Sequence, residues 1–240
     1  MRVGLAGWSN PPTVKSLRGP DRSHLEFYAE HFSCVELNSS FYRTHRQTTY
    51  ASWRLATPRS FRFAVKMPRS ITHECGLRGT SRELKAFFAS IEPLQGKLGA
   101  VLIQLPPSLE FQARLARVFF EKLPRMTAAL LACEPRHGSW FSQAADELME
   151  RFQVARVATD PPRGAGSAEP GGSREQAYYR WHGSPRMYYS SYSEAALQAF
   201  AAQIQGSGAA RSWCIFDNTA AQAAWPDALR FAARVLRATR

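Results

Sequence analysis

Eight short runs of apolar and β-branched residues, which start 23 to 39 residues apart, constrain the fold of this 240-residue chain more than any other feature. That spacing is too long for hairpins and suits strands that alternate with helices. The runs are Val3–Trp8, Cys34–Phe41, Phe61–Met67, Ala100–Leu105, Ala129–Glu134, Val154–Asp160, Ala177–His182 and Trp213–Asn218. Eight such units predict an α/β fold of the TIM-type (β/α)8 barrel class, with residues 1–240 as a single domain. An open doubly wound sheet is the alternative, but no GxGxxG motif follows the first run.

Helical periodicity fills most of the intervals between these runs. Three segments begin with the pattern of a capping box, at Ser23-x-x-Glu26, Thr80-x-x-Glu83 and Ser191-x-x-Glu194. Further helices are expected over Tyr50–Ala56, Leu115–Leu123, Asp146–Phe152 and Ala220–Leu236. The sixth interval differs, because residues 161–176 are rich in Gly, Pro and Ser and lack apolar periodicity. This segment predicts a mobile loop on the face where the strands end.

Composition and charge narrow the class of protein. Hydrophobic residues make up 45% of the chain, which is enough for a sizeable core. No apolar run is long enough to span a membrane and no signal-peptide pattern opens the chain, so we expect a cytoplasmic protein without a membrane partner. The four cysteines lack the spacing of a zinc site. The net charge of +12 points to anionic ligands, although no run of five basic residues marks a nucleic-acid interface.

Polar and aromatic side chains gather where the apolar runs end. In LLACEPRHGSW (130–140), for example, the run stops at an acid, a guanidinium and an imidazole. In a barrel the C-terminal ends of all strands form one face, which carries the functional residues. We therefore expect one polar site built from Trp8, Glu36, Asn38, Tyr42, Arg43, Lys66, His73, Gln104, Glu134, Arg136, His137, Asp160, Arg180, His182, Asp217 and Asn218.

The amino-acid sequence at these strand ends resembles that of the YecE-like family, domain of unknown function 72. The matching segments are GWSN (7–10), VELNSSFYR (35–43), FRFAVKMPRSITH (61–73), LGAVLIQLPPSL (98–109), EPRHGSW (134–140), YYRWHG (178–183) and FDNTAAQAA (216–224). The resemblance covers nearly the whole chain and implies a TIM-type barrel. It supplies no reaction, because the function of that family is not established. The short first loop and the Gly-rich sixth loop depart from the family pattern.

The first functional hypothesis is an enzyme that acts by acid/base chemistry on a phosphorylated or otherwise anionic substrate. The candidate anion-binding cations are Arg43, Lys66, Arg136 and Arg180. The candidate catalytic groups, which orient the substrate or exchange a proton, are Glu36, Glu134, His137 and His182. The other candidate substrate-binding residues are Trp8, Asn38, Tyr42, His73, Gln104, Asp217 and Asn218. The competing interpretation is that arginine and glutamate only neutralise each other.

Two further hypotheses come from other classes of protein. A divalent-metal enzyme, either phosphodiesterase-like or isomerase-like, could draw ligands from Glu36, His73, Glu134, Asp160, His182 and Asp217. No HxH or HExxH spacing supports it, so no residue is assigned to a metal. A non-catalytic nucleic-acid or nucleotide-binding protein is the third hypothesis, because aromatic and basic residues alternate in SSFYR and YYRWHG. The oligomeric state is left open.

Overall fold

The computed structural model describes residues 1–238, apart from the side chains of residues 15 and 236–238. Its strands form one sheet in the order β7-β9-β10-β1-β2-β3-β4-β5-β6-β8. Their bounds are β1 (Arg2–Ala6), β2 (Cys34–Leu37), β3 (Arg62–Lys66), β4 (Leu98–Gln104), β5 (Leu130–Glu134), β6 (Val154–Arg156), β7 (Ala158–Asp160), β8 (Gly171–Gly172), β9 (Gln176–Trp181) and β10 (Arg211–Phe216). Each of the eight predicted runs contains strand residues.

The sheet is nearly closed and barrel-like. Strands β6 and β7 stand near opposite ends of the order, yet only Val157 separates them in the chain. Strand β6 pairs with β5 and β7 pairs with β9, both in parallel. The amide of Val157 donates to the carbonyl of Cys133 at 2.8 Å. The stretch 154–160 therefore joins one side of the sheet to the other, and only the two-residue β8 pairs antiparallel.

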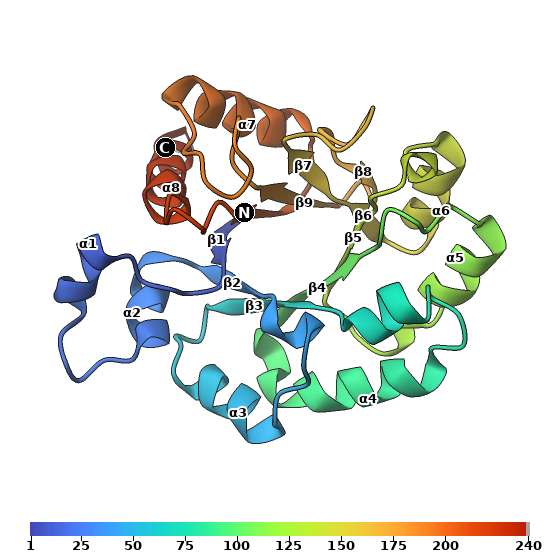
Figure 1. Ribbon diagram of the computed structural model, residues 1–240, viewed down its shortest axis with the longest axis horizontal. Coiled ribbons are helices and arrows are strands. Elements are labelled where there is room, and N and C mark those ends of the chain that lie inside the picture. Colours follow the sequence, from blue (N-terminus) through green and yellow to red (C-terminus); the bar gives the residue numbers. More distant parts are fainter. Residues whose placement is uncertain (239–240) are drawn as a thin grey trace.

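Helices cover the outside of this sheet, with the strands at the centre in Figure 1. Their bounds are α1 (Pro12–Lys15), α2 (His24–His31), α3 (Gln47–Leu55), α4 (Ser81–Ile91), α5 (Ala113–Phe120), α6 (Gln143–Arg151), α7 (Glu194–Gly206) and α8 (Ala224–Ala238). Short helical turns lie at Ser16–Arg18, Ser39–Phe41, Ser70–Glu74, Glu92–Lys97, Leu123–Arg125 and Gly138–Trp140. Across residues 1–238, no helix combines the length and the apolar character that crossing a membrane requires.

One of the three predicted capping boxes is confirmed. Ser23 Oγ accepts from the amide of Glu26 at 3.2 Å, and the Glu26 carboxylate accepts from the amide of Ser23 at 2.7 Å. At Thr80 the predicted helix is confirmed, but the predicted capping hydrogen bond of its side chain is wrong. Helix α4 begins at Ser81, while the buried hydroxyl of Thr80 has no hydrogen-bond partner among the residues described.

The third capping box begins two residues too early. Helix α7 starts at Glu194, and Ser193 caps it by accepting from the amide of Ala196 at 3.2 Å. The hydroxyl of Ser191 instead donates to Asp227 at 2.5 Å. Ser191, which the local pattern predicts as the cap, therefore forms its hydrogen bond with the buried carboxylate of Asp227 on α8.

Strand periodicity divides the core into two parts. One cluster packs between the sheet and its helices and includes Val35, Val65 and Cys133. The other fills the barrel interior and consists of Cys34, Ala64, Ala100, Leu102, Leu130, Ala132, Val157, Tyr178, Trp213 and Ile215. The interior is narrow at Gly4, where an added Cβ would lie 2.1 Å from the carbonyl oxygen of Cys34. Because side chains alternate along a strand, the position two residues after an interior residue also faces inward.

The segment 161–176 takes the place of a helix after β7. Arg156 points outward, with 5% of its surface exposed, and donates to the carbonyls of Gly166 at 2.8 Å and Glu169 at 3.3 Å. The same guanidinium holds Asp146 of α6 at 2.7 Å. Strand β8, inside this segment, pairs with β6. The second half of the segment therefore runs along the outer side of the sheet, and its mobility stays a prediction.

Candidate active site

Six polar side chains occupy the inward positions above the interior core, near the C-terminal ends of five strands and at the residue after β10. They are Glu36, Lys66, Gln104, Glu134, Arg180 and Asp217, each two residues after a member of the interior cluster. We call these six, together with His182, Asn38 and Arg136, the mouth cluster. The period-two rule therefore brings residues far apart in the chain onto one end of the barrel.

Arg180 of β9 is the centre of the mouth cluster, although only 2% of its side chain is exposed. Its Nη2 and Nε lie 2.8 and 3.0 Å from the two oxygens of Glu36. Its Nη1 donates to Glu134 Oε2 at 2.6 Å, and Nη2 also donates to Asp217 Oδ2 at 2.9 Å. One guanidinium thus binds carboxylates from β2 and β5 and from the end of β10.

These ion pairs outweigh the burial of their members. Burial alone raises the pKa of the Glu134 carboxyl, but Arg180 and Arg136 together lower it well below its usual range. Burial likewise raises the pKa of Asp217, and the charges of Arg180 and His182 bring it below its ordinary value. Burial lowers the pKa of Arg180, but the charges of Glu134, Glu36 and Asp217 outweigh burial, and the pKa lies well above its usual value. The carboxylates of Glu134 and Asp217 are therefore ionised at neutral pH and are weak bases.

Arg136 carries a second guanidinium at the outer edge of the mouth cluster. Its Nε donates to Glu134 Oε1 at 2.7 Å, and 14% of its side chain is exposed. Gln104 also donates to Glu134 Oε1, at 3.3 Å. Glu134 therefore binds Arg180 through Oε2 and Arg136 through Oε1. Of these two arginines, Arg136 is the one that offers accessible surface to a ligand.

Lys66 differs from the two arginines because it has no acidic partner. Its Nζ lies 4.1 Å from the centre of the Phe41 ring, and 8% of the residue is exposed. No carboxylate of the described residues lies within ion-pair distance of Nζ, and Glu36, Glu134 and Asp217 are bound to Arg180. Burial lowers the pKa of Lys66 to about 8. The charge of Arg180 adds to the effect, and the charges of Glu36, Glu134 and Asp217 oppose it in part.

His182 is fully buried and forms a pair with Asp217. Its Nδ1 lies 3.0 Å from Asp217 Oδ2, which favours the tautomer with the proton on Nδ1. Its Nε2 has no hydrogen-bond partner within the part of the chain that the structure describes. A buried imidazole with one oriented nitrogen and one unpartnered nitrogen suits proton exchange with a ligand.

Two further predicted residues are Asn38, a member of the mouth cluster, and His73, which lies close to it. The buried Oδ1 of Asn38 has no hydrogen-bond partner among residues 1–238. His73 bonds Thr72 Oγ1 at 2.8 Å, and burial followed by the charge of Lys66 lowers its pKa. Asn38 is thus an unused polar group, and His73 is a neutral ring at the edge of the site.

Five predicted residues make other contacts. Tyr42, 73% exposed, and Arg43 lie on the surface beyond the turn Ser39–Phe41. His137 bonds Ser139 Oγ at 2.8 Å, and Trp8 packs edge-on against Trp53 at 5.0 Å. Asn218 donates to Asp227 at 2.7 Å and to Ser190 at 2.9 Å, so its amide ties a loop to α8. No side-chain hydrogen bond or ion pair joins these five to the Arg180 network within the part of the chain that the structure describes.

The ligand set considered for a divalent metal is divided. Asp160 faces away from the interior and accepts from Tyr192 Oη at 2.8 Å. Three other members of that set, Glu36, Glu134 and Asp217, are bound to the guanidinium of Arg180, which supplies the positive charge among them. No group of three His, Cys, Asp or Glu side chains in the described part of the chain is arranged to bind a metal ion.

Three residues of the site were missing from the sequence prediction. Tyr178 donates to Glu36 Oε2 at 2.8 Å, and its place two residues before Arg180 could have revealed it. Phe41 lies against Lys66. Arg163, in the segment 161–176, interacts electrostatically with Arg136 and Glu134. No periodic signal could have identified Arg163, because its segment is irregular.

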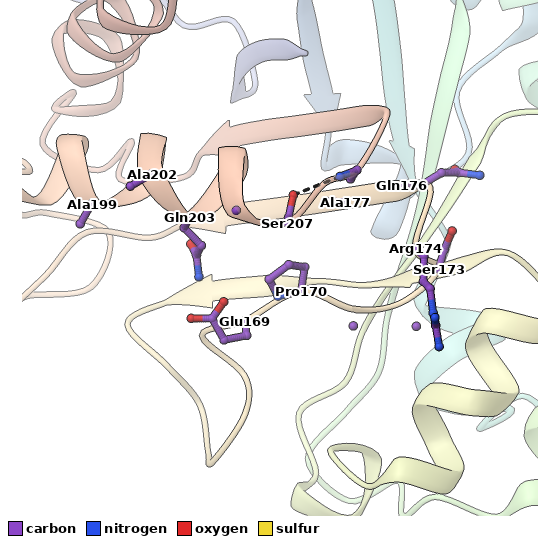
Figure 2. Close-up of a pocket in the computed structure, with 14 residues that line it drawn as sticks. Glu169, Pro170, Ser173, Arg174, Gln176, Ala177, Ala199, Ala202, Gln203 and Ser207 are labelled. Carbon is purple, nitrogen blue, oxygen red and sulfur yellow. Dashed lines mark hydrogen bonds between the residues drawn. The ribbon is translucent and has the colours of Figure 1, made fainter. Parts of the chain in front are cut away.

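A separate hollow of about 800 Å³ lies between the segment Glu169–Ala177 and α7. Figure 2 shows Gln203 of α7 close to Glu169 and Pro170 on one side of it. Most of its other lining residues are glycine, alanine and serine, and none belongs to the mouth cluster. Its size alone does not make it the reactive site, because the convergent charged side chains lie elsewhere.

A family model described as "Protein of unknown function DUF72" matches residues 2–240. Among curated proteins, the chain is 30% identical over 146 residues to the UPF0759 protein YecE of Escherichia coli K12, which covers 60% of this chain and 52% of that protein. It is 30% identical over 178 residues to the UPF0759 protein YunF of Bacillus subtilis, with 69% of this chain and 62% of that protein covered. The matched parts thus span between half and two thirds of these relatives.

Two solved structures share the fold. A DUF72 family protein from Thermotoga maritima has a TM-score of 0.83 and 26% identity, with 98% of both chains covered. A DUF72 family protein from Enterococcus faecalis has a TM-score of 0.80 and 22% identity, with 98% of this chain and 95% of that chain covered. The architecture described above is therefore shared by proteins that differ from this one at about three quarters of their positions.

Proposed function

Because the chain belongs to the DUF72 family, whose description assigns no activity, we propose its function from the geometry of the mouth cluster. We propose a TIM-type barrel enzyme that binds a small anionic substrate, bearing a phosphate or carboxylate, at the C-terminal ends of its strands. Acid/base chemistry by His182 would transform the substrate. The observation that carries this proposal is that Arg180 binds all three carboxylates of the mouth cluster, which leaves Lys66 without an acidic partner among the described residues and Arg136, paired only with Glu134, with accessible surface for a ligand.

The charge balance of the site favours an anion. Three carboxylates, of Glu36, Glu134 and Asp217, lie among Arg180, Arg136, Lys66 and Arg163. Arg136 and Arg163 lie at the outer edge and act on one another electrostatically. An anion placed between them would relieve that repulsion, and a guanidinium binds phosphate or carboxylate through two parallel hydrogen bonds.

Proton exchange falls to His182 in this proposal. Glu134 and Asp217 are held ionised by their cations, so they orient other groups. Asp217 fixes the His182 ring through Nδ1, and Nε2 is left for the substrate. This arrangement resembles the division of labour in a catalytic dyad, where the carboxylate orients the imidazole and the imidazole moves the proton. Glu36, bound to Arg180 and Tyr178, would hold Arg180 in place.

A ligand screen tests the proposal. Phosphorylated and carboxylated metabolites, with their neutral counterparts, would be compared by thermal shift and then by calorimetry at pH 7. We expect at least one anion to stabilise the protein and its affinity to fall about tenfold or more in Arg136→Gln, which removes a charged hydrogen bond. The matched control is Arg125→Gln, because Arg125 is 80% exposed and precedes β5 at the opposite end of the strands. Equal loss in both variants, or no anion binding at all, would refute the site.

Nucleotide or nucleic-acid binding is the second candidate. The ring of Tyr188, 37% exposed, lies edge-on to His182 at 5.6 Å. The neighbouring Tyr189, 45% exposed, has the guanidinium of Arg186 over its ring at 4.0 Å. Such aromatic surfaces beside a cationic site can stack bases. If this candidate holds, Tyr188→Ala would weaken oligonucleotide binding while leaving the affinity for phosphate itself unchanged.

A further inference from the structure

We propose that Lys66 is a covalent nucleophile, whose amine adds to the carbonyl carbon of a small anionic aldehyde or ketone and forms an imine. The inference rests on the proposed function, because the same mouth cluster would bind the anionic group of that substrate. It goes further by naming the reacting functional group.

The position of Lys66 is fixed by the barrel. It is the last residue of β3, two positions after the interior residue Ala64, so its side chain points inward at the C-terminal end of the barrel. Its backbone carbonyl accepts from the Ser40 hydroxyl at 2.7 Å, and the next amide, of Met67, donates to Leu102 at 2.8 Å. These bonds anchor the end of the strand, and Phe41 lies 4.1 Å from the amine.

The surroundings of Lys66 increase the fraction of the neutral amine, which is the nucleophilic form. The amine is desolvated against an aromatic ring, it has no carboxylate within ion-pair distance among the described residues, and it lies near the positive charge of Arg180. Desolvation and a neighbouring cation are the two means by which proteins activate a lysine. With a pKa of about 8, roughly a quarter of the amine is neutral at pH 7.5, against about 0.1% for an ordinary lysine.

Two other lysines, Lys97 and Lys122, have ordinary structural contacts. Lys97 donates to the carbonyls of Arg54 at 2.6 Å and Thr57 at 2.5 Å, so its amine is occupied. Lys122 donates to the hydroxyl of Ser81 at 2.9 Å on an exposed surface. Of these three lysines, Lys66 is the one whose contacts suit covalent chemistry.

The step is balanced without a cofactor. The lone pair of neutral Nζ attacks the carbonyl carbon, and the π electrons move to the carbonyl oxygen, which takes a proton. The nitrogen, now a cation, gives up one of its N–H protons and regains a lone pair, so that a neutral carbinolamine forms. A second proton on that hydroxyl lets it leave as water, while the nitrogen lone pair closes the C=N bond. His182, whose ring Asp217 orients and whose Nε2 has no hydrogen-bond partner among the described residues, would move these protons. Arg136, 14% exposed, would bind the anionic end of the substrate.

Reductive trapping tests the inference. The full chain would be incubated with sodium borohydride and either glyoxylate, pyruvate or dihydroxyacetone phosphate, or the neutral acetone or dihydroxyacetone. We expect at least one anionic compound to leave a stable mass adduct on the peptide that contains Lys66, with at least tenfold less adduct from the neutral counterparts. Lys66→Met should abolish the adduct, and Lys97→Arg should retain it. Lys66→Met is expected to fold, because no acidic partner loses its cation.

Each outcome separates this inference from the proposed function. Anion binding that depends on Arg136, without any adduct on Lys66, overturns the imine and leaves the anion site standing. An adduct of equal size in Lys66→Met also overturns it. Equal labelling by neutral and anionic compounds overturns the anionic substrate class. Failure of both anion binding and labelling overturns the two proposals together.

Discussion

Replacing Arg180 with methionine tests whether its ion pairs hold the mouth together. Methionine keeps an unbranched side chain of similar length but leaves the buried carboxylates of Glu36, Glu134 and Asp217 without their shared cation. The side chains of Glu36 and Glu134 are at most 1% exposed, so water cannot replace the guanidinium. Breaking one partner out of a buried ion pair costs about 3–5 kcal/mol. For a chain of this size the melting temperature should fall by about 6–20 °C.

The pH dependence of that loss gives the sharper test. In the native protein the folded pKa values of Glu134 and Asp217 are lowered, so their stabilising contribution is present above the unfolded values near 4 and is lost only below them. Wild-type stability should thus change little from these groups between pH 7.5 and 5. In Arg180→Met, burial should raise the folded pKa values of these carboxyls, so that protonation relieves the cost as pH falls. The deficit should shrink by at least about 1 kcal/mol at pH 5.

Urea unfolding followed by tryptophan fluorescence, at pH 7.5 and pH 5, measures both quantities. The matched control is Arg156→Met, because Arg156 is also buried, with 7% of its side chain exposed, but lies outside the barrel. Its acidic partner Asp146 is 34% exposed and can be hydrated, so we expect a smaller loss that does not depend on pH. If Arg180→Met costs no more than Arg156→Met, or if its deficit is the same at both pH values, the role assigned to Arg180 is wrong.

Three other predictions follow from single positions. Gly4→Ala should cost about 3 kcal/mol or prevent folding, because its Cβ would meet the Cys34 carbonyl at 2.1 Å, whereas Gly96→Ala, with open space around it, should change the free energy of unfolding by less than about 0.5 kcal/mol. Lys97→Met should cost about 1–2 kcal/mol in urea unfolding, because its amine binds two carbonyls at the end of α3, and an equal loss in Lys122→Met would contradict this reason. The rate of reductive labelling at Lys66 should rise with pH around a midpoint of about 8, and a midpoint near 10.5 would show an ordinary lysine.

The inward members of the site could be predicted because they lie on strands. Glu36, Glu134 and Arg180 are each the last or the second-last residue of a strand, and parallel strands bring their C-terminal ends to the same edge of the sheet. The sequence also indicated the alternative of mutual neutralisation, and the structure shows that Arg180 neutralises Glu36 and Glu134. What the sequence could not separate is which cations remain for a ligand, since that depends on the exposure of each group.

Residues beyond the strand ends were harder to place. Tyr42 and Arg43 follow β2 closely in the chain, yet the intervening turn Ser39–Phe41 ends the period-two alternation and turns them toward solvent. Ser191 fails for a related reason, because its hydroxyl meets a carboxylate on a helix that lies 36 positions later in the chain. Local patterns describe the backbone nearby, and such distant partners can override them.

The first strand of the sheet has a consequence for how the chain is made. Strand β1 pairs with β2 on one side and with β10 on the other. Its backbone hydrogen bonds to β10 can form only after residues about two hundred positions later have been synthesised. At about 5–20 residues per second, a ribosome needs roughly 10–40 s to supply them. During that time β1 is an open strand edge on a growing chain, where pairing with another nascent chain competes with native closure. The last strand to emerge therefore decides whether the first one is protected.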